Sequence, residues 1–185
     1  MKKYIVQSIR LTIALTILLC VLYPVLVAFI GKFAQGGGNG ETIAFNGKVV
    51  GYAAIGQKFD KPGYFWSRPS AVGYNAAGSA GSNKGPSNPD YLKQVSDRID
   101  TLLKYHPYLK KSDIPADMVT ASGSGLDPDI SAQGATIQVE RVAKERGLST
   151  QQVSQLVAQH IEKPALGPEK VNVLKLNIAL DALKK

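Results

Sequence analysis

The stretch YFWSRPSAVGYNAAGSAGSNKGPSNPD (residues 64–90) joins three consecutive aromatic residues to a long run of Gly, Ser, Asn and Ala. Its composition is close to that of a linker. A disordered linker, however, gains nothing from Tyr64, Phe65 and Trp66, whose large apolar surfaces are costly to leave in water. A hinge, a phosphate-binding loop and a surface for a partner are the alternatives that this pattern raises.

Composition narrows the classes of partner. The 185 residues suit one domain with accessory segments, and 22 Lys and Arg against 14 Asp and Glu give a formal net charge of +8. The basic residues are spread along the chain and are not clustered with aromatic ones, which argues against nucleic acid as a partner. A single cysteine, Cys20, excludes an intramolecular disulfide, and with only two histidines no metal cluster is expected.

The segment LTIALTILLCVLYPVLVAFI (residues 11–30) contains no charged residue. As a helix it spans roughly 30 Å, which is the thickness of the hydrocarbon core of a bilayer. We therefore expect a transmembrane helix, kinked by its proline. The residues expected to face lipid and partner helices include Leu11, Leu15, Tyr23, Pro24 and Ile30.

The charges around this segment predict its orientation. Lys2, Lys3 and Arg10 precede it, whereas only Lys32 follows closely. The positive-inside rule then places residues 1–10 in the cytoplasm and the remainder outside a bacterial inner membrane. A cleaved signal peptide is the alternative, but its apolar core of about 7 to 15 residues is shorter and is followed by a small-x-small cleavage site, which is missing here.

Beyond the span, the composition indicates a Gly-rich tether (residues 31–41) and one small extracytoplasmic domain of the α+β class (residues 42–185). The domain opens with TIAFNGKVVGYAAIG (residues 42–56). Asn46 and Gly47 accept the positive φ that a tight hairpin turn requires, and apolar-rich segments flank them. The sequence therefore predicts a β-hairpin here.

Helix-start and helix-stop residues divide the rest of the domain. Asn88 is predicted to cap a helix that ends before Pro107 and packs against the sheet. After a second small-residue loop (residues 114–131), Ser131 is predicted to cap a helix that ends at Gly147. The inward positions predicted for these two helices are Leu92, Val95, Ile99, Leu102 and Leu103, and then Ala135, Val139, Val142 and Ala143.

Two further helices and a strand are expected towards the C-terminus. Residues 148–161 form a helix whose Ser149 and Gln152 have the spacing of a capping box. The sequence VNVL (residues 171–174) is expected to be a strand. A final helix carries the apolar stripe Leu176, Ala179, Leu180 and Leu183.

Three patterns suggest chemistry, and each has a simpler interpretation. GSAGSNKG (residues 78–85) lacks the Gly-Lys-Ser/Thr end and the flanking strand and helix of a P-loop. Asp127 and Asp129 hint at a cation site, but we interpret them as turn and pre-helix residues. Ser122 and Ser124 are possible nucleophiles of an exported hydrolase, although they lack the strand-turn-helix setting of such a serine.

Several of these segments together resemble one family. The motifs run in order over nearly the whole chain: Tyr23-Pro24 in the apolar span, IGQKF (55–59), GYFWSRPSA (63–71), YNAAGSAGSN (74–83), SNPD (87–90), VTASGSGLDPDIS (119–131), RVAKERG (141–147) and VNVLKLNIALD (171–181). In these motifs the chain is similar to the C subunits of the bacterial Kdp-type potassium-transporting P-type ATPases.

The resemblance implies an accessory, non-catalytic subunit of a high-affinity potassium uptake complex. Its partners would be a potassium-translocating subunit, an ATP-hydrolysing P-type subunit and the lipid bilayer. No cofactor would be tightly bound, and ATP and the transported potassium would be handled through the complex. The alternative from another class is an independent, membrane-anchored exported hydrolase.

The resemblance also gives the loops a meaning, because small side chains permit close approach of two backbones. The residues expected to be structural or partner-facing are Tyr64, Phe65, Trp66, Arg68, Pro69, Ser122, Gly123, Gly125 and Asp127.

The family is also described as a catalytic chaperone that promotes ATP binding by the hydrolysing subunit. A Leu-Ser-x-x-Gln-like stretch carries that role in the family, and LSTQQ (residues 148–152) fits this outline at Ser149 and Gln152. The capping box accounts for the same two residues without a nucleotide, and the predicted orientation places them across the membrane from ATP. We therefore prefer the capping interpretation.

Overall fold

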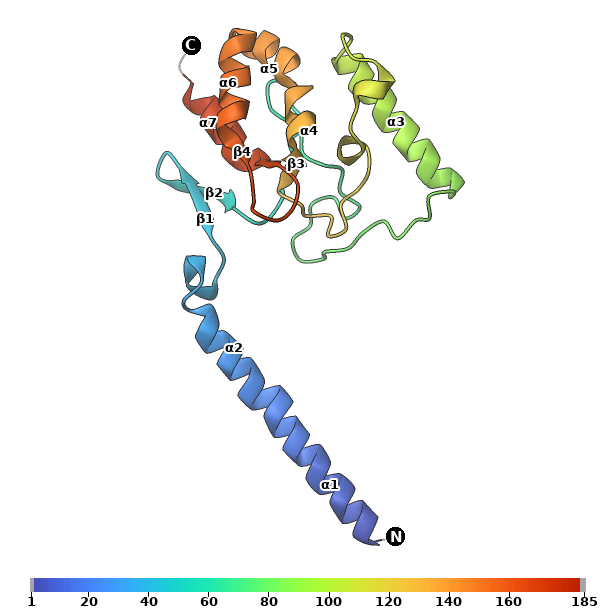
Figure 1. The fold of residues 1–185 in the computed structure, drawn as a ribbon, viewed down its shortest axis with the longest axis vertical. Helices are drawn as coiled ribbons and strands as arrows, with labels where there is room; N and C mark the ends of the chain where they lie inside the picture. The colour runs from blue at the N-terminus through green and yellow to red at the C-terminus, as the bar shows by residue number, and fades with distance from the viewer. Residues whose placement is uncertain (1, 184–185) are drawn as a thin grey trace. The chain divides into compact units, whose positions relative to one another are not determined.

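The fold is that of a computed structural model, which describes residues 2–183 (Figure 1). The chain divides at residue 42 into two compact units, an N-terminal helical unit and a C-terminal α+β domain. The predicted class, one apolar N-terminal helix followed by a small α+β domain, is confirmed.

The N-terminal unit is one long helix in three parts: α1 (Lys2–Thr16), a π-helical segment (Ile17–Leu22) and α2 (Tyr23–Gly31). The portion Lys3–Gly31 is long and apolar enough to cross a membrane, and none of it is buried. Pro24 has no N–H to donate to the preceding turn, and the wider π-helical turns end just before it. Where the sequence predicted a kink at Pro24, the structure shows a local change in helical winding just before it.

The glycine-rich segment that follows contains one ordered turn. Gln35–Gly38 forms a short 3-10 helix in which Gly36 and Gly37 have φ of 74° and 62°. These left-handed values favour glycine, which explains the run of this residue. A two-stranded hairpin comes next, with β1 (Thr42–Phe45) and β2 (Lys48–Tyr52).

The hairpin turn is formed as predicted. Asn46 has φ 50° and Gly47 has φ 75°, the pair of positive values that the sequence indicated. Such a turn matches the right-handed twist of the two strands.

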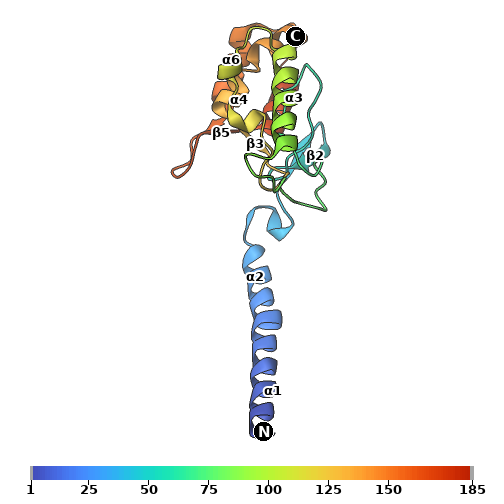
Figure 2. The ribbon, with the colours of Figure 1, turned by 90° about the vertical axis from the view of Figure 1, so that its right-hand side faces the viewer.

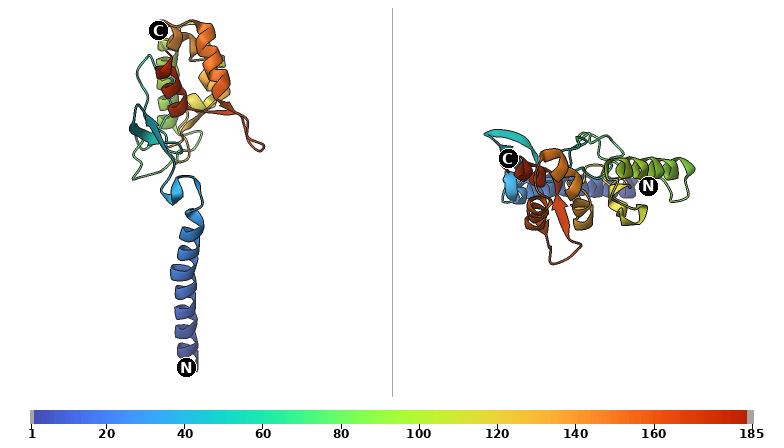
Figure 3. Two further views of the ribbon diagram at one scale, coloured as in Figure 1. Left: turned by 90° about the vertical axis from the view of Figure 1, so that its left-hand side faces the viewer. Right: turned by 90° about the horizontal axis from the view of Figure 1, so that it is seen from above.

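A second, three-stranded antiparallel sheet was only partly predicted. Its strands are β3 (Asp129–Ser131), β4 (Ile161–Glu162) and β5 (Lys170–Asn172), in the order β3-β5-β4. With two or three residues each, these strands are too short to show an alternating pattern. The segment between β4 and β5 projects from the domain (Figure 3).

The strand predicted at residues 171–174 is displaced, and that prediction was wrong in its second half. The side chain of Asn172 accepts a hydrogen bond from Lys175 N (3.0 Å) and so caps a helix, α7 (Val173–Ala182). Because the cap ends the strand, Val173 and Leu174 lie in the first helical turn.

The helices of the domain begin and end close to their predicted signals. Ser131 Oγ accepts a hydrogen bond from Gly134 N (2.9 Å) and so caps the start of a helix. A later helix ends at Gly147, whose φ is 63°. The single helix predicted between them is broken at residues 137 and 138. The four helices of this half are α4 (Ala132–Thr136), α5 (Val139–Arg146), α6 (Thr150–His160) and α7, and α6 packs against both α5 and α7 (Figures 1 and 2).

Helix α3 (Pro89–Tyr105) is capped by Asn88 as predicted, but its packing differs from the prediction. Leu92, expected to face inward, is 52% exposed, and the buried side chain is Leu102 near the helix end. The defined contacts of α3 are with loops, such as the hydrogen bond from Arg98 to the carbonyl oxygen of Val119 (2.9 Å). Of the other predicted inward residues, Val95 and Ile99 are partly buried and pack against the core cluster that contains Leu102, so the prediction fails at the first turn of the helix.

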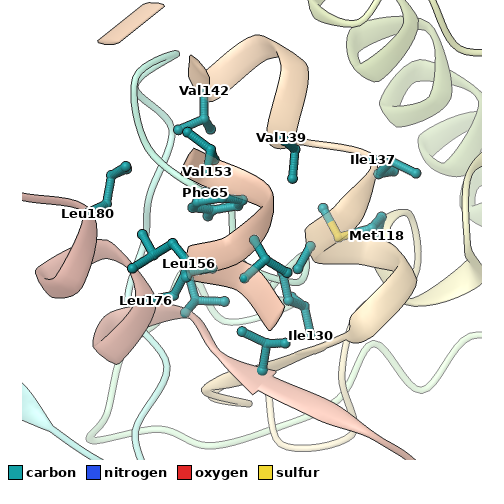
Figure 4. Close-up of a cluster of buried hydrophobic side chains, with 14 of the residues drawn as sticks. Phe65, Met118, Ile130, Ile137, Val139, Val142, Val153, Leu156, Leu176 and Leu180 are labelled. Atoms are coloured by element: carbon teal, nitrogen blue, oxygen red, sulfur yellow. The ribbon is translucent and has the colours of Figure 1, made fainter. Parts of the chain in front are cut away.

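The hydrophobic core gathers side chains from β3, β5 and α4 to α7 around one loop residue, Phe65 (Figure 4). Its side chain is fully buried beside Val153, Leu156 and Leu176 in this view. The aromatic run of the loop is thus part of the core, as the sequence suggested.

Two buried amide side chains hold the backbone of this loop. Asn177 accepts a hydrogen bond from Phe65 N (2.9 Å) and donates one to the Phe65 carbonyl oxygen (3.0 Å). Gln138 accepts from Trp66 N (2.7 Å) and donates to the Trp66 carbonyl oxygen (3.3 Å). These side chains replace the neighbouring strand that a buried extended segment normally needs.

A buried arginine, Arg141, adds hydrogen bonds to the backbone at the start of this loop. Arg141 donates to the carbonyl oxygens of Pro62 and Tyr64 (3.0 Å to Tyr64), and also to Gln138 Oε1 (2.7 Å). Within residues 2–183, no carboxylate forms an ion pair with Arg141. Its charge is therefore balanced by carbonyl and amide dipoles. We call Gln138, Arg141 and Asn177 the loop clamp.

The guanidinium group of Arg141 also lies between two rings. It is 4.3 Å from the ring centroid of Trp66, and its Nε donates to His106 Nε2 (2.9 Å). Since His106 Nε2 accepts, Nδ1 carries the proton and donates to the Leu102 carbonyl oxygen (2.7 Å). Burial and Arg141 lower the pKa of His106 to about 4, so the ring is neutral at physiological pH.

We expect Asn177→Ala to lower the free energy of unfolding by about 2–4 kcal/mol, because the N–H and C=O groups of Phe65 would both be left buried without partners. The measurement is chemical denaturation of the full chain in a non-ionic detergent, followed by the fluorescence of the sole tryptophan, Trp66. Asn75→Ala is the matched control, since the Asn75 side chain is exposed and accepts one hydrogen bond, from the backbone N–H of the exposed loop residue Ala77. Equal losses in the two variants would contradict the role of Asn177.

Candidate functional site

The two small-residue loops lie against each other, and we call residues 67–87 and 119–128 the loop pair. Arg68 and Asp127 form an ion pair (2.9 Å) between them. Ser70 Oγ donates to the carbonyl oxygen of Gly125 (2.6 Å). Ser122 N donates to the Pro69 carbonyl oxygen (3.3 Å), with Ser122 itself buried. The predicted loop residues are therefore brought together in one place.

Glycine is required where the loops touch. Gly125 has φ 68°, and a Cβ built on it would lie 2.7 Å from Val72 Cγ2 and 2.8 Å from the Ala80 carbonyl oxygen. Further along, Ser79 Oγ donates to the Ser124 carbonyl oxygen (3.0 Å). The contact is made backbone to backbone, with no room for larger side chains at Gly125. Gly123 differs, since a Cβ there would meet nothing within 4 Å.

The outer side of the loop pair is a surface with few side-chain atoms. Residues 76–80 and 83–87 are exposed, and they are Ala, Gly, Ser, Asn, Lys and Pro. Within this stretch, Ser79 and the Ala80 carbonyl oxygen contact the second loop at Ser124 and Gly125. A surface with such small side chains lets another protein approach the main chain closely.

The aromatic run anchors the loop pair at its beginning. The Tyr64 hydroxyl donates to Asp181 (3.0 Å), and the Arg146 guanidinium lies 4.4 Å from the Tyr64 ring centroid while forming an ion pair with Asp181 (2.7 Å). Trp66 is half-buried, and its indole N–H donates to the Lys61 carbonyl oxygen (3.1 Å). The three aromatic residues therefore position the start of the loop pair through contacts within the domain.

The acidic residues of the second loop are paired with basic or backbone groups. Asp127 accepts from Asp129 N (3.0 Å) in addition to Arg68, as expected of a turn residue. Asp129 pairs with Lys170 (2.6 Å), which raises the pKa of that lysine. Within residues 2–183, no group of three or more His, Cys, Asp or Glu side chains has the arrangement of a metal site.

The hydroxyl and imidazole groups of the loops have local roles. Ser124 Oγ accepts from Leu126 N (3.1 Å), and Ser122 is 3% exposed. Both ring nitrogens of His106 are used, by Leu102 and Arg141. No feature of this geometry supports a serine nucleophile activated by His106.

Ser149 and Gln152 form a capping box at the start of α6. Gln152 Oε1 accepts from Ser149 N (3.0 Å) and Ser149 Oγ (2.8 Å), and Ser149 Oγ accepts from Gln152 N (3.2 Å). Both residues are exposed, and neither lines the groove beside Trp66 or the groove beside Asp129. The capping geometry uses the side-chain oxygens of both residues, Ser149 Oγ and Gln152 Oε1.

In the apolar helix, the predicted lipid- and partner-facing residues are all exposed. These are Leu11, Leu15, Tyr23, Pro24 and Ile30. The sole cysteine, Cys20, is exposed in the π-helical segment. The surface of this helix is therefore free to meet lipid or other helices.

The loop clamp and His106 were not predicted as a unit. A signal was present, because Gln138 and Arg141 fall among the apolar inward positions of the predicted helix, where a polar residue must find a buried partner. Their partner is the backbone of residues 62–66, which is more than seventy residues away in the sequence. No spacing rule identifies such a partner.

Comparison with known proteins agrees with this architecture. A family model described as "K+-transporting ATPase, c chain" matches residues 5–182. The chain is 64% identical over 182 residues to the potassium-transporting ATPase KdpC subunit of Flavobacterium johnsoniae, covering 98% of this chain and 100% of that protein. It is 52% identical over 188 residues to that of Bacteroides fragilis, with 98% of each covered. It is 47% identical over 191 residues to that of Herpetosiphon aurantiacus, with 100% of this chain and 98% of that protein covered. The chain therefore belongs to the family of the C subunits of potassium-transporting ATPases.

Proposed function

We propose that the chain is an accessory, non-catalytic subunit of a high-affinity, ATP-driven potassium uptake pump. The observation that carries this proposal is the family match over residues 5–182, which includes the apolar helix, the loop pair and the loop clamp. In this pump the chain assembles with a potassium-translocating subunit and an ATP-hydrolysing P-type subunit. Potassium is the ion that the pump transports, and this chain holds no tightly bound cofactor.

Two surfaces of the chain suit assembly with such partners. The apolar helix exposes its whole surface, and in a bilayer it can pack against helices of the other subunits. The outer side of the loop pair offers exposed backbone with small side chains, and Ser79 and Ala80 tie part of it to the second loop. Small side chains let a partner approach the main chain closely.

Co-purification tests the assembly. We expect a tagged form of the chain, isolated in mild detergent from its native membrane, to carry two larger membrane subunits, one of which hydrolyses ATP. Potassium-dependent ATPase activity of the eluate is the readout, and the untagged strain is the control. Recovery of the tagged chain alone, under conditions that keep other membrane complexes intact, would argue against the function.

We further propose that the chain spans the inner membrane once, with its N-terminus in the cytoplasm and the α+β domain outside. Lys2, Lys3 and Arg10 precede the apolar segment, and this excess of basic residues supports the orientation.

Cysteine labelling measures this orientation. A cysteine at Asn39, an exposed position beyond the helix, should react with a membrane-impermeant maleimide in intact cells whose outer membrane has been made permeable. The matched variant Gln7→Cys, at an exposed position before the apolar segment, should react only after lysis, and the parent chain shows the background from Cys20. The reverse pattern would show that the domain lies in the cytoplasm.

The chain also acts, in this proposal, as a catalytic chaperone that promotes ATP binding by the hydrolysing subunit. If the domain is outside, Ser149 and Gln152 cannot contact cytoplasmic ATP. The effect then passes through the membrane helix as a bias on the conformational equilibrium of the partner. The capping box supports this indirect route, because it uses the side-chain oxygens of both residues, Ser149 Oγ and Gln152 Oε1, within the domain.

Substitution of Gln152 separates the two routes. We expect Gln152→Ala to lower the stability of the domain by about 0.5–1 kcal/mol through loss of the capping box, with the apparent ATP affinity of the assembled pump unchanged. Ser149→Ala should give a similar loss, and the exposed neighbour Gln151→Ala should give none. Thermal unfolding and the ATP dependence of hydrolysis are the two measurements. A severalfold rise in the ATP requirement with unchanged stability would instead indicate direct nucleotide contact.

A further inference from the structure

An open groove of about 430 Å³ lies between residues 58–74 and α3. Its walls are largely aromatic and apolar, formed by Phe59, Trp66, Pro69, Tyr74, Tyr105 and Met118. A small-molecule site typically encloses most of its ligand, whereas this groove is open to solvent along one side. Its form suits an extended segment better than a small molecule.

The polar groups on the floor of the groove already have partners within the domain. The Trp66 indole N–H donates to the Lys61 carbonyl oxygen, and the Tyr74 hydroxyl donates to the Arg68 carbonyl oxygen. Desolvation raises the pKa of Tyr74 to about 12, so this phenol stays neutral. Ser67 is occupied in the same way, since its Oγ donates to the Gln57 carbonyl oxygen (2.7 Å). The floor therefore offers apolar surface and few free hydrogen-bonding groups.

The floor is also preformed. Trp66 is held by its backbone bonds to Gln138, by the Arg141 guanidinium on its ring (4.3 Å), and by an edge contact with Tyr105 (5.1 Å between centroids). A side chain bound against Trp66 would not have to order it first. Preformed aromatic grooves are among the surfaces that recognise extended peptides.

The rim of the groove has an excess of positive charge. Two basic residues, Lys58 and Arg98, line it together with one acidic residue, Asp60. Asp60 is paired with Lys58 (2.9 Å) at an exposed position. Arg98 donates to the Val119 carbonyl oxygen (2.9 Å) and forms no ion pair within the part of the chain that the structure describes. A guanidinium has five N–H donors, so Arg98 retains donors for a carboxylate.

We propose that this groove binds an extended segment of another pump subunit that carries an apolar side chain next to an Asp or Glu. The apolar side chain rests on Trp66 and Met118, and the carboxylate pairs with Arg98. The inference rests on the proposed function, because the partner is a subunit of the same complex. It deepens that function by assigning a binding site, and the chemistry of its occupant, to a surface separate from the outer side of the loop pair.

Photo-crosslinking in the full chain, expressed with its pump, tests the proposal. A benzophenone amino acid replaces Thr101, an exposed residue of α3 that lines the groove. We expect an adduct with another pump subunit, and peptide mass spectrometry should place it beside an Asp or Glu. The same photoreactive residue at Leu92, exposed on α3 outside the groove lining, is the matched control and should give little adduct.

Charge variants show whether the carboxylate matters. Arg98→Glu should reduce the adduct about tenfold, the equivalent of about 1.4 kcal/mol, whereas Arg98→Lys should retain most of it. Lys58 lies on the rim and its side chain is 68% exposed, so Lys58→Glu should reduce the adduct without disturbing the fold. This variant replaces Arg98→Glu as the test if Arg98→Glu unfolds the domain. Thermal unfolding of each variant is the check on folding.

The outcomes separate this inference from the proposed function. If the pump subunits co-purify but Thr101 gives no adduct, or gives one that Arg98→Glu and Lys58→Glu leave unchanged, the groove is not the binding site and the function stands. If no pump subunit co-purifies with the chain, the proposed function itself fails. An adduct that maps to a peptide without Asp or Glu also overturns the carboxylate pairing.

Discussion

The structure of the α+β domain depends on how three buried side chains satisfy the backbone of residues 62–66. This segment enters the core because Phe65 is fully buried, yet within residues 2–183 the N–H and C=O groups of Phe65 bond to the Asn177 side chain and not to a strand. The hydrogen bonds to the backbone of the segment come from Gln138 in the turn before α5, from Arg141 in α5 and from Asn177 in α7. A buried peptide group without a partner costs about 1–3 kcal/mol, so the segment can remain in the core only while the loop clamp is intact.

The loop pair follows from this constraint. Its Gly, Ser and Asn residues have little apolar surface with which to order themselves. They begin at a backbone that the clamp has already fixed at Trp66, and within a few residues Arg68 and Ser70 join them to the second loop. Gly125 then allows main chain to meet main chain. The loop pair has the composition of a linker, but it is ordered because its start is fixed to the core.

The sequence predicted those features that depend on neighbours in the chain. The apolar helix, the Asn46-Gly47 turn, and the caps at Asn88, Ser131 and Ser149 all rest on residues a few positions apart, and the structure contains each of them. The short strands β3 and β4 and the placement of α3 on loops were missed, since they depend on distant segments. The aromatic run indicated that the loop is ordered. Its partners Arg141 on α5 and Asn177 on α7 could not be predicted, because they are distant in the sequence.

The clamp also explains why a charged residue is kept in the interior. A buried cation without a carboxylate is costly, and Arg141 offsets that cost with carbonyl oxygens, an amide oxygen, a neutral imidazole and the face of Trp66. Each of these acceptors is specific in position, so only one arrangement of the loop satisfies the guanidinium. A hydrophobic residue of similar size would fill the space but would accept many arrangements. The arginine therefore fixes the conformation of the aromatic run, from which the loop pair continues along the chain and whose Trp66 lines the groove.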